Sequence, residues 1–245
     1  MLYRHLVWRE NLTAARLFGK GRVYLINVSD ISMAFSENKV LSNVSFLLDK
    51  KECACIIGRN GCGKSTLLNI LASMQKPDSG FFDLAGASVG YAPQSDILFP
   101  DLSVGDNLKF WASAAGIDHK SIWQGECIQT LEIADFKKKK VKHLSGGMRR
   151  RVSVAIAIIK NPEIIILDEP FAGLDVFFKA NLMEFLRKLK GLGKTIIYTC
   201  HSTDETTGLA DKIFLIENGS VTFSGGKSDI AKLFEKMQTG VSFTR

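Results

Sequence analysis

The chain has 245 residues, of which 46% are hydrophobic, and it carries a formal net charge of +7. This length and apolar fraction indicate an ordinary globular protein with one large α/β domain or two small ones. The longest apolar runs, such as residues 154–159 and 164–167, fall far short of the roughly 20 residues that a transmembrane helix needs. The sequence therefore predicts no membrane span of its own, and its positive charge favours an anionic partner.

Residues 1–22 form a basic N-terminal extension. They carry five basic residues against one acidic residue, Glu10, and their apolar residues recur at near-helical spacing. One interpretation is a basic amphipathic helix that rests on a membrane or on a partner. The other is a short helix packed on its own domain, or a loosely ordered extension, as is common at termini.

Three strand-like runs follow the extension. Residues 23–35, 40–48 and 53–57 are rich in β-branched or aromatic residues, and helical patterns come later, which predicts an α/β domain over residues 23–245. Cys53 and Cys55 alternate along the third run, where packing is favoured over a C-x-C metal or redox site. The five cysteines cannot all pair, so a reducing compartment is the simplest location for the chain.

A phosphate-binding loop follows the third run. The pattern G-x-x-x-x-G-K-[ST] is matched by Gly58, Arg59, Asn60, Gly61, Cys62, Gly63, Lys64 and Ser65, and a helix-like run begins at Thr66. Glycines let successive N–H groups curl around phosphates, and the dipole of the following helix favours the anion. In such a loop Lys64 reaches the β- and γ-phosphates, Ser65 ligates Mg²⁺, and Cys62 is expected near the nucleotide.

A mostly helical segment is predicted at about residues 98–160, inserted between strands of the core sheet. Ser103 is expected to cap a helix that has one apolar stripe and ends at Gly116. Helical spacing resumes from about residue 121 to 133, and again after Gly147. Four consecutive lysines at 137–140 are most simply a solvated face, and a phospholipid or nucleic-acid contact is the alternative.

Two carboxylates follow the buried strand expected at residues 164–167. Asp168 suits magnesium binding and Glu169 suits polarising an attacking water, because in phosphoryl transfer a protein chiefly positions groups and stabilises charge. A further buried strand is predicted at residues 195–199. Together with the phosphate-binding loop, the carboxylate pair predicts a P-loop NTPase, a class that also contains kinases, GTPases and helicases.

A glycine-rich sequence within the helical segment indicates which family of P-loop NTPases the chain resembles. It consists of Leu144, Ser145, Gly146 and Gly147 followed by Met148, and it resembles the signature motif of the ABC-type ATPase family. The resemblance extends over roughly four-fifths of the chain, from Val23 to about Gly226. It implies an α/β P-loop NTPase core with a mixed sheet flanked by helices, an inserted helical subdomain, and an ATPase that uses ATP and Mg²⁺.

Other positions resemble further functional elements of the family. Phe35 resembles the aromatic residue that stacks on adenine, although tyrosine is more usual there, and Val40 resembles a neighbouring apolar contact to the base. Gln94 resembles the Q-loop glutamine, and His201 resembles the switch histidine. Asp175 ends an Ala-Gly-Leu-Asp stretch that resembles the D-loop, which more commonly reads Ser-Ala-Leu-Asp. The resemblance implies a catalytic set of Glu169, His201, Lys64 and Gln94, and metal ligands from Ser65, Gln94 and Asp168.

The family resemblance also implies partners. Two ATPase domains assemble head to tail, as a homodimer or a heterodimer, so that Ser145 and Gly147 of one chain would contact the γ-phosphate held by the other. Glycine lets backbone N–H groups approach a phosphate closely, which suits this role. The chain is then expected at the cytoplasmic face of a membrane, bound to a separate transmembrane permease through Gln94 and residues 96–116. Residues 102–116 look more like exporter-type subunits than importers.

A soluble ABC-type ATPase that acts on nucleic acid or ribosomes is the alternative function. Its support is a pI of 9.1 and the lysine run at residues 137–140. The sequence offers no basic groove interleaved with aromatic residues and no base-reading motif, so nucleic acid is not the favoured partner.

Overall fold

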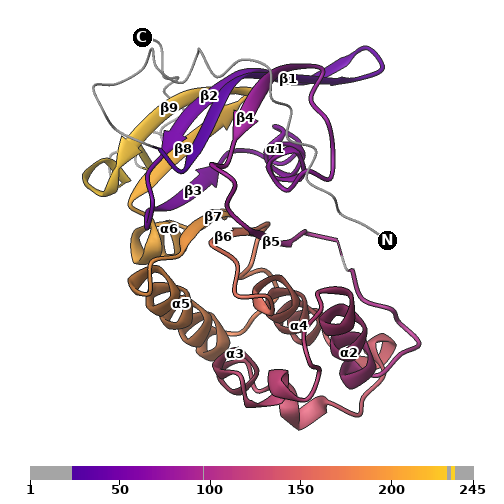
Figure 1. The fold of residues 1–245 in the computed structure, drawn as a ribbon. Helices are drawn as coiled ribbons and strands as arrows, with labels where there is room; N and C mark the ends of the chain where they lie inside the picture. The colour runs from indigo at the N-terminus through magenta and orange to yellow at the C-terminus, as the bar shows by residue number, and fades with distance from the viewer. Residues whose placement is uncertain (1–23, 96, 231–232, 235–245) are drawn as a thin grey trace.

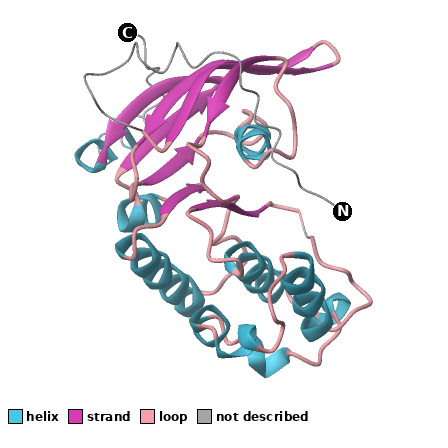
Figure 2. Ribbon diagram, in the orientation of Figure 1, coloured by secondary structure: helices cyan, strands magenta, loops and turns pink. Residues whose placement is uncertain are grey.

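The computed structural model describes residues 24–95, 97–230 and 233–234. The basic extension, residues 1–22, and the expected start of the domain at Val23 lie outside the described residues, as does Asp96. Figure 1 shows two β-sheets at one end of the molecule and a group of helices at the other, and Figure 2 shows the same division by type of element.

The first sheet has three antiparallel strands in the order β2-β1-β4, and its strands are β1 (Ile26–Phe35), β2 (Asn38–Leu48) and β4 (Ser79–Asp83). A two-residue turn joins β1 to β2, so that Phe35 pairs with Asn38. The sequence predicted both strands. It did not predict that they form a sheet separate from the core sheet.

The second sheet is mixed and has the order β5-β6-β7-β3-β8-β9. Its strands are β3 (Cys53–Ile57), β5 (Val89–Ala92), β6 (Ile164–Leu167), β7 (Thr195–Thr199), β8 (Lys212–Glu217) and β9 (Ser220–Gly226), all parallel except β9. Every residue of β3, β6 and β7 is buried, as expected for central strands covered on both faces. Cys53 and Cys55 are fully buried, as their interpretation as packing residues predicts.

Two apolar cores cover the two faces of the second sheet. On one face the first sheet and α1 (Lys64–Leu71) pack against alternate strand residues such as Ile56 and Ile166. On the other face the helices of the inserted segment, together with α5 (Val176–Gly191) and α6 (Thr203–Leu209), pack against residues such as Ile165 and Leu167. This α/β arrangement confirms the predicted fold class.

The inserted segment lies between β5 and β6 and contains α2 (Val104–Ala114), α3 (Glu126–Thr130) and α4 (Gly146–Ile158), with 3₁₀-helical turns at 121–124, 133–136 and 141–143. Ser103 caps α2 by accepting a hydrogen bond from the backbone N–H of Asp106, and Gly116 lies just beyond its end with φ +73°, so both predictions are confirmed.

The helical spacing expected from about residue 121 to 133 corresponds to the 3₁₀ turn at 121–124, the short helix α3 and the start of the 3₁₀ turn at 133–136. Gly125 is extended (φ −67°, ψ 136°) and Glu132 is left-handed (φ +48°), so the backbone leaves the helix at both positions. The apolar residues Ile122, Ile128 and Ile133 nevertheless all pack into the same core. Within the described part of the chain, none of the helices is both long enough and apolar enough to cross a membrane.

Candidate functional site

The order of the central strands brings the predicted chemical groups to one edge of the second sheet. β6, β7 and β3 are neighbours and run parallel, so their carboxyl ends meet. The phosphate-binding loop follows β3, Asp168 and Glu169 follow β6, and His201 lies two residues beyond the end of β7. Ligands of open α/β sheets bind at this edge, so the topology alone marks it as the candidate site.

The phosphate-binding loop ends at Gly63, which caps the N-terminus of α1 with φ +104°. A Cβ at this position would lie 2.7 Å from the carbonyl oxygen of Val40, so the close packing requires glycine. The ammonium of Lys64 turns back into the loop and donates hydrogen bonds to the carbonyls of Gly58 (2.8 Å) and Arg59 (3.0 Å). The loop thus concentrates positive charge and helix N–H groups at one place.

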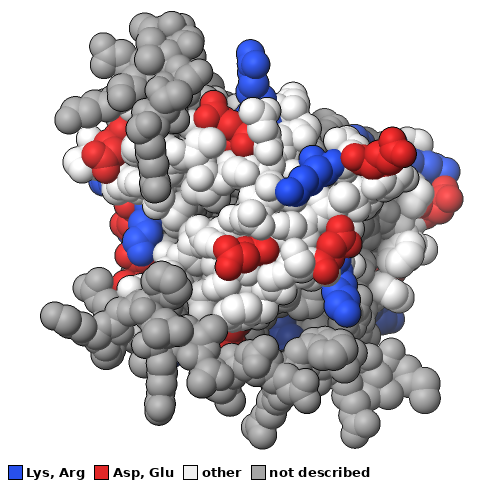
Figure 3. All heavy atoms as spheres, turned by 90° about the horizontal axis from the view of Figure 1, so that it is seen from above, with Lys and Arg blue, Asp and Glu red and all other residues white. Residues whose placement is uncertain are grey.

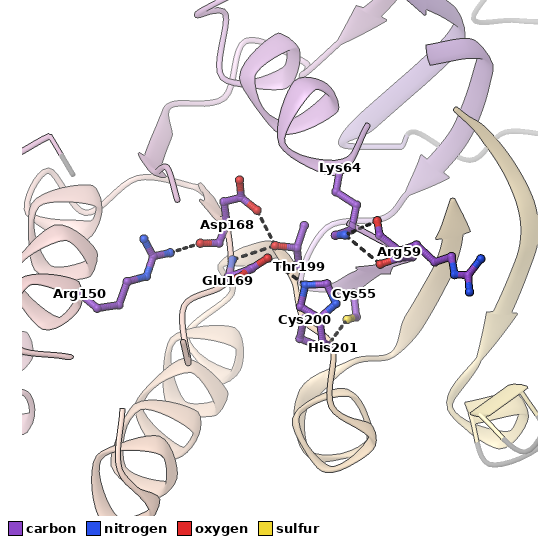
Figure 4. Close-up of polar contacts among 10 residues, drawn as sticks. Cys55, Arg59, Lys64, Arg150, Asp168, Glu169, Thr199, Cys200 and His201 are labelled. Carbon is purple, nitrogen blue, oxygen red and sulfur yellow. Dashed lines mark hydrogen bonds and ion pairs between the residues drawn. The ribbon is translucent and has the colours of Figure 1, made fainter. Parts of the chain in front are cut away.

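Asp168 and Glu169 lie beside the end of β7, as Figure 4 shows. Asp168 is buried, and its Oδ1 accepts a hydrogen bond from the Thr199 hydroxyl at 2.6 Å. Its Oδ2 is also buried and has no hydrogen-bond partner among the residues that the structure describes. The Oε1 of Glu169 lies 2.9 Å from the Nε2 of His201. The predicted water-polarising carboxylate and switch histidine are therefore in direct contact.

A surface cleft connects the carboxylates to the inserted helical segment. It is lined by Gln94, Gly146, Arg149, Arg150, Asp168, Glu169, Ala172 and Gly173. Ser145 caps α4 by accepting the N–H of Met148 at 3.2 Å, and both Ser145 and Gly146 are exposed. Gly147 packs against the backbone at Gly173, where a Cβ would lie 2.6 Å from the Gly173 carbonyl oxygen. The signature sequence thus lies against the D-loop-like segment of its own chain.

The remaining predicted residues have varied surroundings. Phe35 ends β1 and is 49% exposed, whereas Leu144 is buried in the core. The carboxylate of Asp175 accepts the N–H of Phe178 at 3.0 Å and so caps α5.

The other residues of the phosphate-binding loop differ in burial. Cys62 is half-buried, with its sulfur turned towards Gly58. Ser65 and Thr66 lie in the first turn of α1, and Arg59, Asn60 and Gly61 are exposed in the loop. Their contacts with a nucleotide stay predictions.

Thr199 and Arg150 are site residues that were not found from the sequence. Thr199 bonds both Asp168 and Glu169, and Arg150 on α4 is buried and donates to the carbonyls of Pro93 (2.5 Å) and Asp168. The available signals were weak: a threonine that ends an apolar strand, and an arginine on a helix face that is otherwise buried.

The chain is similar to known proteins over most of its length. A family model described as ABC transporter matches residues 41–172. An uncharacterized ABC transporter ATP-binding protein of Methanocaldococcus jannaschii is 34% identical over 84% of this chain and 79% of that protein. The linearmycin resistance ATP-binding protein LnrL of Bacillus subtilis is 30% identical over 84% of this chain and 70% of that protein. A Nod factor export ATP-binding protein of Ralstonia nicotianae is 34% identical over 82% and 67%, respectively.

Solved structures share the fold. The ATP-binding subunit of an ABC transporter has a TM-score of 0.77 and 26% identity, with coverage of 86% of this chain and 93% of that chain. A dimeric ATP-binding cassette bound to ADP and Pi, in a post-hydrolysis state, has a TM-score of 0.75 and 25% identity, with coverage of 82% and 98%. The chain therefore belongs to the ABC transporter family, as one of its ATP-binding and ATP-hydrolysing subunits.

Proposed function

We propose that the chain powers an exporter by hydrolysing ATP at the cytoplasmic face of a membrane, where it binds a separate transmembrane permease. The observation that carries the ATPase part is the contact of Glu169 with His201 at the strand edge that also holds the phosphate-binding loop. The direction of transport is supported by relatives named for Nod factor export and for linearmycin resistance. The test of the hydrolytic site is the Glu169→Gln variant, which should bind ATP and hydrolyse it far more slowly than the wild-type chain.

The residues at the edge of the sheet divide the chemistry among them. Glu169 would orient and polarise the attacking water, and His201 would hold the carboxylate and contact the γ-phosphate. When a nucleotide binds, the Lys64 ammonium would leave the carbonyl oxygens of the loop and donate its hydrogen bonds to the β- and γ-phosphates. Ser65, Gln94 and Asp168 would hold Mg²⁺. The buried Oδ2 of Asp168 has no hydrogen-bond partner among the described residues, which fits this assignment. The metal would supply neutralisation of charge on the phosphate oxygens.

The signature sequence is proposed to serve the nucleotide of a second ATPase subunit. Ser145 and Gly146 are exposed at the N-terminus of α4, a helix of 13 residues whose first N–H groups suit a phosphate. The solved cassette with 25% identity is a dimer. A head-to-tail dimer would place this helix end over the partner's phosphate-binding loop, and the chain would form it with itself or with a second ATPase subunit.

The permease is proposed to dock near Gln94 and α2. Three apolar side chains, Phe99, Leu102 and Phe110, are 40–47% exposed there, and we call them the α2 apolar patch. The rings of Phe99 and Phe110 meet edge to face at a centroid distance of 4.8 Å. Contiguous exposed apolar side chains are typical of protein interaction sites. The patch falls inside the docking region that the sequence predicts, residues 96–116.

Phe110→Glu is expected to weaken binding to the permease by more than about tenfold, because a charge would be buried in an apolar contact. The measurement is recovery of the polytopic membrane protein with the tagged chain after detergent extraction of native cells. Leu192→Glu is the matched control, since Leu192 is 68% exposed beyond the end of α5. Equal recovery with Phe110→Glu and with the wild-type chain would remove the α2 apolar patch from the interface.

The alternative, a soluble ATPase that acts on nucleic acid, is not favoured by the relatives. Figure 3 shows that acidic and basic side chains are interspersed over the described residues of the face seen from above. In the lysine run, the ammonium of Lys137 lies over the Trp123 ring, 3.7 Å from its centroid. The same purification of the tagged chain would support this alternative if it recovered ribosomes or DNA-bound proteins in place of a membrane protein. Binding to nucleic acid should also weaken as the salt concentration rises.

Alkylation of Cys62 is expected to inhibit ATP hydrolysis, and bound ATP is expected to protect the thiol. Burial raises the pKa of Cys62, and the nearby Lys64 offsets this only in part. Since the thiolate is the reactive form, inhibition by iodoacetamide should be slow at neutral pH and should accelerate as pH rises towards the raised pKa. The measurement is the residual ATPase rate against time and pH, with Cys62→Ala as the insensitive control. Full activity after complete modification of Cys62 would contradict the prediction.

A further inference from the structure

The hydroxyl of Thr199 joins the two carboxylate residues of the site. Thr199 is the last residue of β7 and is fully buried. Its Oγ1 donates a hydrogen bond to the Oδ1 of Asp168 at 2.6 Å and accepts one from the backbone N–H of Glu169 at 2.8 Å. A hydroxyl carries one donor and two acceptor positions, so a single side chain satisfies both bonds at once.

Strand register explains why the hydroxyl lies at this point. β7 runs between β6 and β3, with Tyr198 opposite Leu167 and Thr199 opposite Ile56. The residue after Tyr198 is therefore beside the residue after Leu167, which is Asp168. A hydrogen bond of 2.6 Å from a hydroxyl to a carboxylate is of the short, charge-assisted kind that fixes orientation strongly.

The backbone of Glu169 has an uncommon conformation that the bond to Thr199 holds in place. Its φ of +52° lies in the left-handed region, which is uncommon for residues other than glycine. The turn is held at both ends, because the Glu169 N–H bonds Thr199 and the Glu169 carbonyl accepts the N–H of Ala172 at 3.1 Å. In this conformation the carboxylate of Glu169 reaches His201. The hydroxyl thus holds the strained residue that aims the proposed catalytic carboxylate.

We infer that Thr199 is a positioning residue for ATP hydrolysis. Its hydroxyl holds Asp168 by Oδ1, which leaves Oδ2 for the metal, and it holds the backbone from which Glu169 reaches His201. The Asp168 carboxylate and the Glu169 backbone are therefore both fixed relative to β7, the strand that leads to His201. The inference rests on the proposed function, in which Asp168 binds Mg²⁺ and Glu169 positions the water.

The direct test is Thr199→Val, which keeps the shape of the side chain and removes the hydroxyl. The expected result in the purified chain is a fall in kcat of about 10- to 100-fold, because small displacements of catalytic groups are costly. The KM for ATP should change less than kcat, since Thr199 is fully buried and its hydroxyl bonds Asp168 and Glu169. Thr199→Ser restores the hydroxyl and should bring kcat back to within about threefold of wild type.

Thr195 supplies the matched control for stability. It lies on the same strand, is also fully buried, and its hydroxyl oxygen accepts the backbone N–H of Lys51 at 2.8 Å, away from the carboxylates. Thr195→Val should lower Tm about as much as Thr199→Val while keeping kcat within about twofold of wild type. A second readout needs no turnover: the rise in Tm when Mg²⁺ is added to the ADP complex should shrink in Thr199→Val and persist in Thr195→Val.

The possible outcomes separate the inference from the proposed function. A kcat of Thr199→Val within about twofold of wild type, or equal losses in both valine variants, overturns the positioning role. Glu169→Gln is measured in the same series. If it turns over slowly while Thr199→Val is normal, only the positioning role fails. If it turns over at the wild-type rate, the proposed assignment of the carboxylates fails as well.

Discussion

Glu169→Gln is expected to bind ATP as the wild-type chain does and to hydrolyse it about 10²- to 10⁴-fold more slowly, the usual contribution of a positioned general base. Glutamine keeps the size of the side chain and a hydrogen bond to His201, whose Nε2 lies 2.9 Å from the carboxylate. It removes the negative charge that polarises the water. The loss should therefore fall on kcat and leave the affinity for nucleotide near its wild-type value.

The measurement combines steady-state ATPase assays with equilibrium binding of a fluorescent ATP analogue. Glu205→Gln is the matched control, because Glu205 lies on α6, shortly after His201, and pairs with Lys179 at 3.0 Å. It removes one carboxylate charge from the same region without touching the site, so kcat should stay within about twofold of wild type. Wild-type turnover in Glu169→Gln would refute the assignment of Glu169 as the residue that activates water.

Local sequence patterns predicted much of the core sheet because its central strands are short, apolar and buried on both faces. β3, β6 and β7 were located to within a residue, and the phosphate-binding loop and carboxylates follow directly from them. β4 has no such pattern, since four of its five residues are exposed. Its pairing with β1, which completes a separate sheet, depends on contacts between distant parts of the chain. Such pairing cannot be read from a local period.

Local sequence patterns also explain which site residues were predicted and which were not. Lys64, Asp168 and His201 each stand at a recognisable distance from a motif or a strand end. The contacts of Thr199 and Arg150 in the site are with residues far along the chain: Thr199 bonds Asp168, 31 positions away, and Arg150 bonds Pro93, 57 positions away. Their roles depend on strand order and helix placement, which only the assembled fold supplies.

Two inactive variants are expected to restore activity when mixed, if the sites are shared head to tail between two copies of the chain. Lys64→Ala removes the ammonium aimed at the phosphates, and Ser145→Arg obstructs the exposed end of α4, so each alone should lose at least about 10²-fold in turnover. A mixed dimer keeps one composite site with Lys64 from one copy and Ser145 from the other. With random exchange at equal amounts, about one quarter of all sites should be intact.

The measurement is the ATPase rate across a series of mixing ratios at constant total protein, with a maximum expected near equal amounts. The matched control mixes Lys64→Ala with the double variant that carries both changes, where every site lacks Lys64 and no recovery is expected. If each site used the signature of its own chain, the first mixture would also stay inactive, and that result beside an active wild-type chain would exclude the shared site. A further outcome is a wild-type chain that is inactive alone and hydrolyses ATP only after a second, different ATPase subunit is added. That result would identify the functional pair as a heterodimer, because two copies of this chain would then not form a working site with each other.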